Sequence, residues 1–292
     1  MEKSKFEKLH NKYYKKLLII PLILFLISIL YISSFYTQNQ DFIHKDISLT
    51  GGTSVTVTGN FNIDQLKTDL SQDLEELNIV EIYDIVTREQ KAIIIETTLE
   101  GDQTRDILES YFEYKLTDEN SSFEFTGSSL GESFYRQLII AIIFAFIFMA
   151  LVVFALFRTF VPSTAVIISA FADILMTLAL VDFLGIKLSS AGIVAFIMLI
   201  GYSVDTDILL TTRILKRTEG SLNHRIFGAF KTGTTMTLTS FLAILFALIF
   251  VKSFSITLSQ MFTVLVIGLG FDLINTWITN VSILKWYVEK KK

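Results

Sequence analysis

Five ionisable side chains stand inside stretches of sequence that are otherwise almost entirely apolar. They are Asp173, Asp205, Asp207, Arg213 and Asp272. A charge in the interior of a membrane costs at least about 2.5–3.5 kcal/mol, so such residues are expected to serve a function. A carboxylate held away from water keeps a proton more readily and releases it when a cation approaches. The pattern predicts a proton route; hydrogen bonds that only join helices are the alternative.

Helical spacing predicts which of these aspartates face one another. Asp205 and Asp207 are two residues apart, about 200° around a helix, so they cannot share one face. We expect Asp205 to face Asp173, because Gly201, one turn earlier, lets a neighbouring helix approach closely. Asp207 is then expected to face another helix or a partner subunit.

Polar side chains accompany two of the aspartates. Asp173 has hydroxyls one turn away on either side, at Ser169 and Thr177. Asp272 belongs to a polar stripe that also contains Gly268, Thr276, Thr279 and Asn280. Helix packing is the simpler explanation for the threonines.

The composition indicates a membrane protein. Of 292 residues 51% are hydrophobic, and the absence of cysteine excludes disulfides and thiol chemistry. Six apolar runs are long enough to cross about 30 Å of hydrocarbon. They lie at 17–36, 134–157, 162–181, 188–210, 232–251 and 257–284. The first is expected to be a retained span, because it is too long for a signal peptide and no clear small-residue cleavage site follows.

The segment 37–133 is predicted to be a water-soluble insert. It holds 20 acidic and 6 basic residues, a net charge of −14, whereas the rest of the chain carries +10. So acidic an insert argues against a nucleic-acid partner. Strands at 54–58, 79–87, 92–98 and 123–126 and helices at 63–77 and 101–116 follow the order β-α-β-β-α-β. That order is typical of an α+β ferredoxin-like domain.

The distribution of basic residues predicts the orientation. The two tails, Arg158 and the 211–231 loop hold 16 Lys and Arg, whereas the two short loops on the other side hold only Lys187 and Lys252. By the positive-inside rule, the tails 1–16 and 285–292 are cytoplasmic and the insert 37–133 is extracytoplasmic. Spans two to six then occupy 134–284.

Other candidate sites are weaker. Asp46 is followed by Gly51 and Gly52, a pattern that could form a functional loop, although such glycines more often only make a turn. Asn120 fits an N-glycosylation acceptor pattern, which is frequent by chance. The three histidines are scattered without metal-ligand spacing, so neither a metal nor another cofactor is expected.

The segment 201–213 resembles the fourth-span motif of the SecF branch of the SecD/SecF protein-export family. Its residues are Gly201, Tyr202, Ser203, Asp205, Asp207 and Arg213. The Asp46–Gly51–Gly52 segment is similar to the family's Gly-Gly signature, and 232–240 to its threonine-rich fifth span. The layout of one span, an external domain and five spans also agrees, so the resemblance covers nearly the whole chain.

The motif departs from the common bacterial pattern in a way that resembles the archaeal branch. Asp205 stands where the bacterial pattern has Asn, Thr206 where it has Asp, and Thr212 where it has the Asp before the arginine. The resemblance transfers directly to Asp173 and Arg213. Asp205 and Asp207 lie near the motif's acidic positions without matching them residue by residue, and Asp272 has no counterpart in the bacterial pattern.

The resemblance implies a non-enzymatic accessory subunit of the Sec translocase at the cell membrane. It implies that the six spans are half of an assembly like the resistance-nodulation-division (RND) transporters, completed by a SecD-like subunit. It also implies contact with the Sec channel and the exported polypeptide, and in bacteria such proteins use the proton-motive force.

Three alternatives belong to other classes of function. Half of an RND-like exporter of lipids or small molecules would be expected to carry a larger external domain. An intramembrane aspartyl protease needs a Tyr-Asp pair and a Gly-x-Gly-Asp motif, but Ala172 precedes Asp173 and the segment 268–272 has one residue too many. A scaffold without ion movement uses the same buried hydrogen bonds as a proton path.

Overall fold

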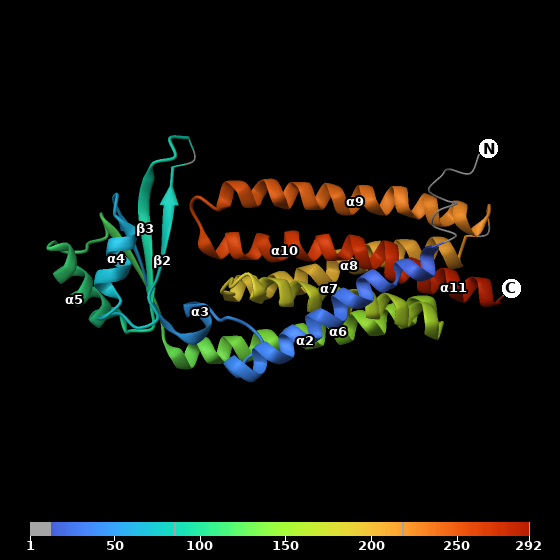
Figure 1. Cartoon of the computed structure of the whole chain (residues 1–292), viewed down its shortest axis with the longest axis horizontal. Helices are drawn as coiled ribbons and strands as arrows, with labels where there is room; N and C mark the ends of the chain where they lie inside the picture. The colour runs from blue at the N-terminus through green and yellow to red at the C-terminus, as the bar shows by residue number, and fades with distance from the viewer. Residues whose placement is uncertain (1–12, 85, 218, 292) are drawn as a thin grey trace.

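Six long helical segments form one bundle with a small sheet domain at one end (Figure 1). The computed structural model describes residues 13–84, 86–217 and 219–291. Six segments are long and apolar enough to cross a membrane: Tyr13–Asn39, Ser128–Phe157, Phe160–Phe183, Ser190–Leu215, Leu222–Val251 and Ile256–Lys291. These segments confirm the predicted fold class. Residues 1–12 of the predicted N-terminal tail lie outside the described residues.

The spans are longer than the apolar runs that predicted them. The first five are α2 (Ile19–Asn39), α6 (Ser128–Phe157), α7 (Phe160–Phe183), α8 (Ser190–Leu215) and α9 (Leu222–Val251). Helix α9 begins ten residues before the predicted start at 232, because the Ser221 hydroxyl accepts a hydrogen bond from the backbone N–H of His224. The first turns of α9 are polar, so hydropathy alone placed the start of this helix too late.

The last span changes its helical geometry part-way. It consists of α10 (Ile256–Ile274), a π-helical turn η1 (Asn275–Asn280) and α11 (Val281–Lys291). Single π-helical turns inside α-helices occur often at functional sites. The sequence analysis did not anticipate this one.

The two described ends of the chain meet at the end of the bundle away from the sheet. The Tyr14 hydroxyl donates to Glu289 Oε2 at 2.7 Å, and the Ser282 hydroxyl donates to the Tyr14 carbonyl at 3.2 Å. Helices α7 and α8 are the most buried spans, whereas α6 and α9 expose most of their length. Asp173 of α7 and Asp207 of α8 are among the residues that these helices bury in the interior of the bundle.

The insert has the predicted α+β topology. Its elements are β1 (Gly52–Thr58), α4 (Ile63–Leu70), β2 (Asn78–Tyr83), β3 (Gln90–Thr97), α5 (Gly101–Phe112) and β4 (Ser121–Thr126). The sheet order is β2-β3-β1-β4, and every adjacent pair is antiparallel. Val55 pairs with Ile95 and Val57 with Ile93, and these side chains form a core with α4 and α5. The predicted split β-α-β order is confirmed.

Two local predictions in the insert were wrong. Helix α4 ends at Leu70 rather than near 77, although Leu74 is still buried in the core. The β2–β3 turn spans Asp84 to Glu89 instead of starting at Arg88. The Asp84 carboxylate accepts from the backbone N–H groups of Val86 and Thr87, which closes the turn earlier than the hydrophobic pattern suggested.

A four-residue helix joins the domain to the bundle. Helix α3 (Ile47–Thr50) follows the first span and leads directly into β1. Figure 1 shows it beside the start of α6, at the junction between sheet and spans. The segment that precedes the sheet is thus part of the bundle's end rather than a free linker.

Candidate functional site

Three aspartates from three helices lie fully buried inside the bundle. Asp173 belongs to α7, Asp207 to α8 and Asp272 to α10. We call them, with the side chains that bond to them, the carboxylate cluster. The bonding side chains are Ser203, Thr237, Asn275, Thr276 and Asn280.

Asp173 is held at both carboxylate oxygens. The Ser203 hydroxyl donates to its Oδ2 at 2.5 Å, and the Asn275 amide donates to its Oδ1 at 2.7 Å. One donor comes from α8 and the other from the π-helical turn. Asp173 therefore joins three spans through two side-chain hydrogen bonds.

Thr276 connects the other two aspartates. Its Oγ1 lies 2.8 Å from Asp207 Oδ1 and 3.0 Å from Asp272 Oδ1. A hydroxyl has one proton to donate, so it can satisfy only one of the two oxygens as a donor. The second contact becomes a hydrogen bond when that carboxyl carries a proton and donates to the threonine oxygen. The geometry thus accommodates a proton between Asp207 and Asp272.

Asp207 shows a further imbalance between its two oxygens. Oδ1 accepts from both Thr276 and the Asn280 amide, the latter at 2.7 Å. Oδ2 is buried and has no hydrogen-bond partner among the described residues. A buried charged oxygen without a donor is costly, whereas a protonated oxygen is not. Both observations fit a cluster that holds protons.

The cluster also lacks compensating positive charge. None of its three carboxylates forms an ion pair with Lys or Arg in the described parts of the chain. The penalty for an unpaired buried ion is several kcal/mol. Three negative charges packed together without a described cation would therefore be strongly unfavourable.

The prediction that Asp205 faces Asp173 was wrong. Asp205 is exposed on the outer face of α8, and Asp207 points inward. A Cβ built on Gly201 would meet nothing within 4 Å, so no helix packs closely there. The close approach is at Gly268 instead, where a Cβ would lie 2.4 Å from Leu199. The expected separation of Asp205 and Asp207 onto different faces is confirmed.

Arg213 stands apart from the carboxylates. Its guanidinium donates to the Gly228 carbonyl and, at 2.9 Å, to the Thr232 hydroxyl, both on α9. The prediction grouped Arg213 with the aspartates, but its bonds fasten the end of α8 to α9. Tyr202 is also partly exposed, and Ser203 is the one motif residue of 201–203 that reaches the cluster.

The threonines of α9 divide into two groups. Thr237 is buried and lies 3.4 Å from Asp272 Oδ2 and 3.2 Å from the hydroxyl of Thr206. Thr235 and Thr239 donate to the backbone of their own helix and are exposed. Thr206 occupies the position of the bacterial Asp, and through Thr237 it is linked to Asp272.

Asp46 anchors a second polar site, at the junction with the domain. Its Oδ1 accepts from the backbone N–H of Ser48 at 2.7 Å, and its Oδ2 accepts from the Gln260 amide of α10 at 3.1 Å. Gln260 Oε1 in turn accepts from the N–H of Ser189, and the Ser48 hydroxyl from the N–H of Ser190. We call these five residues the linker clasp. It ties the segment before β1 to the starts of α8 and α10.

Gly51 and Gly52 complete the clasp through their backbone conformation. Their φ angles are +88° and +140°, which L side chains rarely adopt. A Cβ on Gly51 would lie 2.3 Å from Ser128 Cα, and one on Gly52 would lie 2.3 Å from the Thr97 carbonyl oxygen. The glycines let the chain pass from α3 into β1 directly beside α6, so backbone geometry explains why glycine is needed at these two positions.

The segment before the clasp carries one further ion pair. Lys45 Nζ lies 2.7 Å from Asp41 Oδ2, and the Tyr135 hydroxyl of α6 donates to Asp41 Oδ1. Partial burial opposes ionisation of Asp41. The hydrogen bonds from Lys45, Tyr135 and the Phe42 N–H outweigh burial and hold the pKa of this carboxyl below its ordinary value. The segment just after α2 is thus fixed to α6.

Sequence reasoning missed Asn275 of the carboxylate cluster and Gln260, Ser189 and Ser190 of the linker clasp. Asn275 was not singled out, although an amide within an apolar span is a signal of the same kind as a carboxylate. Gln260 sits near the start of the last span, where a polar residue is unremarkable in sequence. Thr276 and Asn280 were in the predicted stripe, but the π-helical turn that presents Asn275, Thr276 and Asn280 together has no sequence signature.

Comparison with known families identifies the chain's relatives. The family described as "Protein export membrane protein SecD/SecF, C-terminal" matches residues 106–290. A protein named "Protein-export membrane protein SecF" from Methanocaldococcus jannaschii is 42% identical over 96% of this chain and 97% of its own length. A protein of the same name from Pyrococcus furiosus is 36% identical over 95% of this chain and 92% of its own length.

A solved structure shares the fold. SecDF from Thermus thermophilus, described as a translocon-associated membrane protein, matches 98% of this chain with a TM-score of 0.74 and 18% sequence identity. The chain spans 39% of that protein's length. The match supports the arrangement of a six-span bundle with a small domain at one end.

Proposed function

The chain belongs to the SecD/SecF family of protein-export membrane proteins, and we propose that it is a non-enzymatic accessory subunit of the Sec translocase. It promotes export of polypeptides across the cell membrane together with a SecD-like subunit and the Sec channel. Protons that enter and leave the carboxylate cluster drive this activity. The observation that carries the coupling is the proton-sharing geometry of Asp207, Thr276 and Asp272.

The proposed coupling starts from electrostatic repulsion inside the bundle. Removing a proton from the cluster leaves neighbouring negative charges on α7, α8 and α10 without a cation. Those helices can then lower the energy only by separating or by admitting water. Packed helices respond to such a change by moving between discrete arrangements rather than by deforming continuously.

Helix α10 provides the connection to the domain. Asp272 lies near its end, and Gln260 lies in its second turn, bonded to Asp46 of the linker clasp. A displacement of α10 is therefore passed through one side-chain hydrogen bond to the segment that leads into β1. The domain moves with the bundle, and the emerging polypeptide is handled there.

A partner subunit accounts for the exposed face of α8. This face carries Gly201, Tyr202 and Asp205 in the middle of an apolar helix. A carboxylate that faces hydrocarbon is unfavourable, so such residues usually face protein or water. We assign this face to the SecD-like subunit, in an RND-like pairing of two six-span halves.

The proposed orientation follows from charge. The described chain ends lie together at one end of the bundle, and Lys216, Arg225 and Lys291 line one cavity there. We assign this end to the cytoplasm and the domain at 37–133 to the outside.

Export under an imposed proton gradient tests the coupling. Inverted membrane vesicles containing the chain and its partner would translocate a secreted reporter with and without the gradient. We expect Asp173→Asn and Asp272→Asn to abolish stimulation by the gradient. Asp205→Asn, on the same membrane-spanning bundle but outside the cluster, should retain it. Normal stimulation in the first two variants at normal protein level would refute proton coupling.

Co-purification tests the assignment of the partner independently. The full chain extracted in mild detergent should retain a SecD-like chain, and Asp205→Arg should weaken that association. Recovery without such a chain, together with a lipid- or drug-transport defect on deletion, would favour the alternative of an RND-like exporter half.

A further inference from the structure

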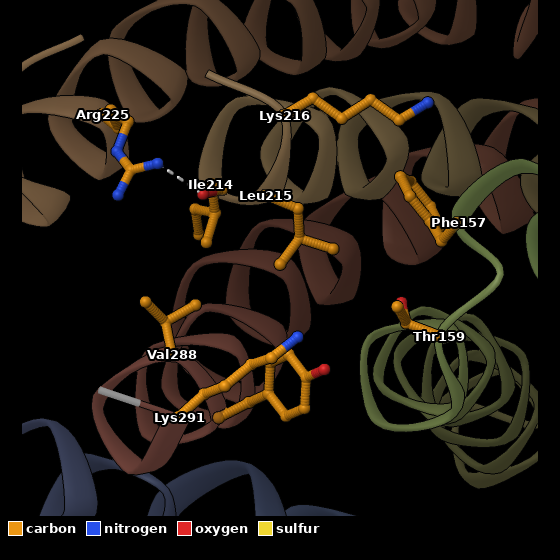
Figure 2. A pocket seen from close by; sticks show the side chains of 9 residues that line it. Phe157, Thr159, Ile214, Leu215, Lys216, Arg225, Val288 and Lys291 are labelled. Carbon is orange, nitrogen blue, oxygen red and sulfur yellow. Dashed lines mark hydrogen bonds between the residues drawn. The ribbon is translucent and has the colours of Figure 1, made fainter. Parts of the chain in front are cut away.

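A cavity of about 520 Å³ opens at the end of the bundle away from the sheet. It lies between the loop that joins α6 to α7, the end of α8, the start of α9 and the end of α11. Figure 2 shows Arg225 and Lys216 on one side of it, Lys291 reaching toward its middle, and Thr159 on the far side. The proposed export function uses none of these residues.

The lining of this cavity is strongly basic. Lys216, Arg225 and Lys291 come from three separate elements, and no acidic residue is among the described residues that line it. Phe157 and Tyr287 lie beside the lysines, with the Lys216 and Lys291 ammonium groups 5.9 Å and 5.8 Å from the respective ring centres. Three like charges kept around one cavity indicate an anionic occupant.

Two buried polar atoms of the lining lack a partner. Arg225 Nη1 donates to the carbonyls of Ile214 and Arg217, which fixes the guanidinium, but its Nε is buried without an acceptor among the described residues. The Thr159 hydroxyl is also buried and unpartnered. Buried donors are normally satisfied, and these two lie on different sides of the cavity, so an occupant with acceptor atoms gains a hydrogen bond from whichever donor it reaches.

The start of α7 adds further donors on the side of Thr159. Thr159 is the N-cap residue of this helix, yet its side chain caps no backbone N–H. The first N–H groups of a helix have no partner within the helix, and the helix dipole places positive potential there. An oxyanion beside Thr159 would therefore gain both the hydroxyl and this potential.

The surroundings of the cavity identify where the anion comes from. Phe160 is 75% exposed beside Thr159, and Trp286 is exposed beside Tyr287, with Lys290 over its ring. Exposed aromatic residues next to lysines are typical of the membrane–water interface. An anionic group at the membrane–water interface is most readily supplied by a lipid headgroup. We propose that the cavity binds the phosphate of an anionic phospholipid from the adjoining leaflet.

Lipid retention by the purified full chain tests this proposal. Native mass spectrometry would count phosphatidylglycerol molecules retained from mixed micelles, with phosphatidylcholine, a zwitterion without net charge, as the comparison. We expect one phosphatidylglycerol per chain and weaker retention of phosphatidylcholine. Lys216→Gln with Lys291→Gln should weaken the apparent affinity roughly 30-fold, about fivefold for each lysine. Thr159→Val, which keeps every charge, should weaken it about fivefold.

A matched control and two outcomes decide the proposal. Lys16→Gln with Lys231→Gln removes the same charge from exposed residues outside the lining and should leave affinity unchanged. Equal weakening by both double variants would mean that general surface charge binds the lipid, which overturns the site. Displacement of the lipid by millimolar inorganic phosphate would overturn the lipid assignment in favour of a soluble anion.

Discussion

The carboxylate cluster and the linker clasp are both built on aspartates, but they differ in how well those aspartates are satisfied. In the clasp, each oxygen of Asp46 accepts a hydrogen bond from its own N–H donor, and neither donor is shared with a second carboxylate. In the cluster, one threonine hydroxyl serves two carboxylates and one oxygen of Asp207 has no described partner. A carboxylate with a complete set of donors is stabilised in its charged form, whereas one with too few donors favours the protonated form.

This difference assigns separate roles to the two regions. The clasp needs no change of protonation to hold together, so it can transmit a movement without taking part in its cause. In the proposed mechanism, the cluster is not stable with all its carboxylates charged, so its packing depends on proton occupancy. Helix α10 contributes residues to both regions and is the element through which they communicate.

The largest effect is expected at the clasp's backbone. Gly51→Ala would add a Cβ 2.3 Å from Ser128 Cα at a φ of +88°. We expect a loss of at least about 3 kcal/mol in unfolding free energy, measured by denaturation of the full chain in detergent. Gly127→Ala is the matched control, because a Cβ there meets nothing within 4 Å. Similar stability of the two variants would mean that the junction is not rigidly packed.

A smaller effect is expected from removing the hydroxyl shared within the cluster. Thr276→Val keeps the shape of the side chain but leaves Asp207 and Asp272 without their common partner. We expect a loss of about 2 kcal/mol and a weaker response of export to the proton gradient. Thr235→Val, an exposed threonine on α9, is the control and should change neither. An unaltered gradient response in Thr276→Val would show that the bridge is not part of the proton path.

Removing the Gln260 side chain from the clasp should reduce stability less than removing the Thr276 hydroxyl from the cluster. Gln260→Leu removes the donor to Asp46 and the acceptor for the Ser189 N–H at the bundle's end, where water can replace them in part. We expect about 1 kcal/mol of destabilisation, together with reduced export despite an unchanged proton content of the cluster. Restoration of export by Gln260→Glu would contradict the donor role, because a carboxylate cannot donate to Asp46.

The smallest effect concerns Glu96, a buried carboxyl of β3. Burial raises its pKa above the ordinary value of 4.5, against the opposing hydrogen bond from the Asn78 amide. The folded chain keeps this proton at pH values where the unfolded chain has released it. Stability therefore falls as pH rises from about 4.5 through the raised pKa.

Glu96→Gln should remove this part of the pH dependence. We expect the stability of the variant to rise relative to the wild type as pH increases through that interval, measured from unfolding curves at several pH values. Glu124→Gln, an exposed carboxyl on β4, should leave the pH profile unchanged. A flat profile in the wild type would show that Glu96 is not buried in the full chain.

Hydrophobic patterning predicted the architecture because membrane spans and a small sheet domain both depend on it. Six apolar runs predicted the six spans, and the alternation in 54–58 and the strand-like run 92–98 predicted the two central strands. The ends of elements were less accurate, since caps such as Ser221 and turns such as Asp84 depend on single side chains. The end of α4 was predicted too late for a related reason: Leu74 continues the apolar pattern after the helix has ended.

The site was harder to predict, because facing directions depend on tertiary packing. Helical phase correctly separated Asp205 from Asp207, but it could not tell which of them points inward. The choice of Asp205 relied on Gly201 as a packing position, and the helices meet at Gly268 and Gly233 instead. Asp272 was among the predicted candidates, but its link to Asp207 through Thr276 requires the π-helical turn at Asn275–Asn280.

The central claim is that the carboxylate cluster holds a proton at neutral pH. Infrared spectroscopy of the full chain in lipid nanodiscs reports this directly, through the carbonyl stretch of a protonated carboxyl. We predict such a band in the wild type at pH 7, its loss or shift in Asp207→Asn and Asp272→Asn, and its retention in Asp205→Asn. A wild-type spectrum without the band, or one unchanged by both cluster variants, would contradict the account.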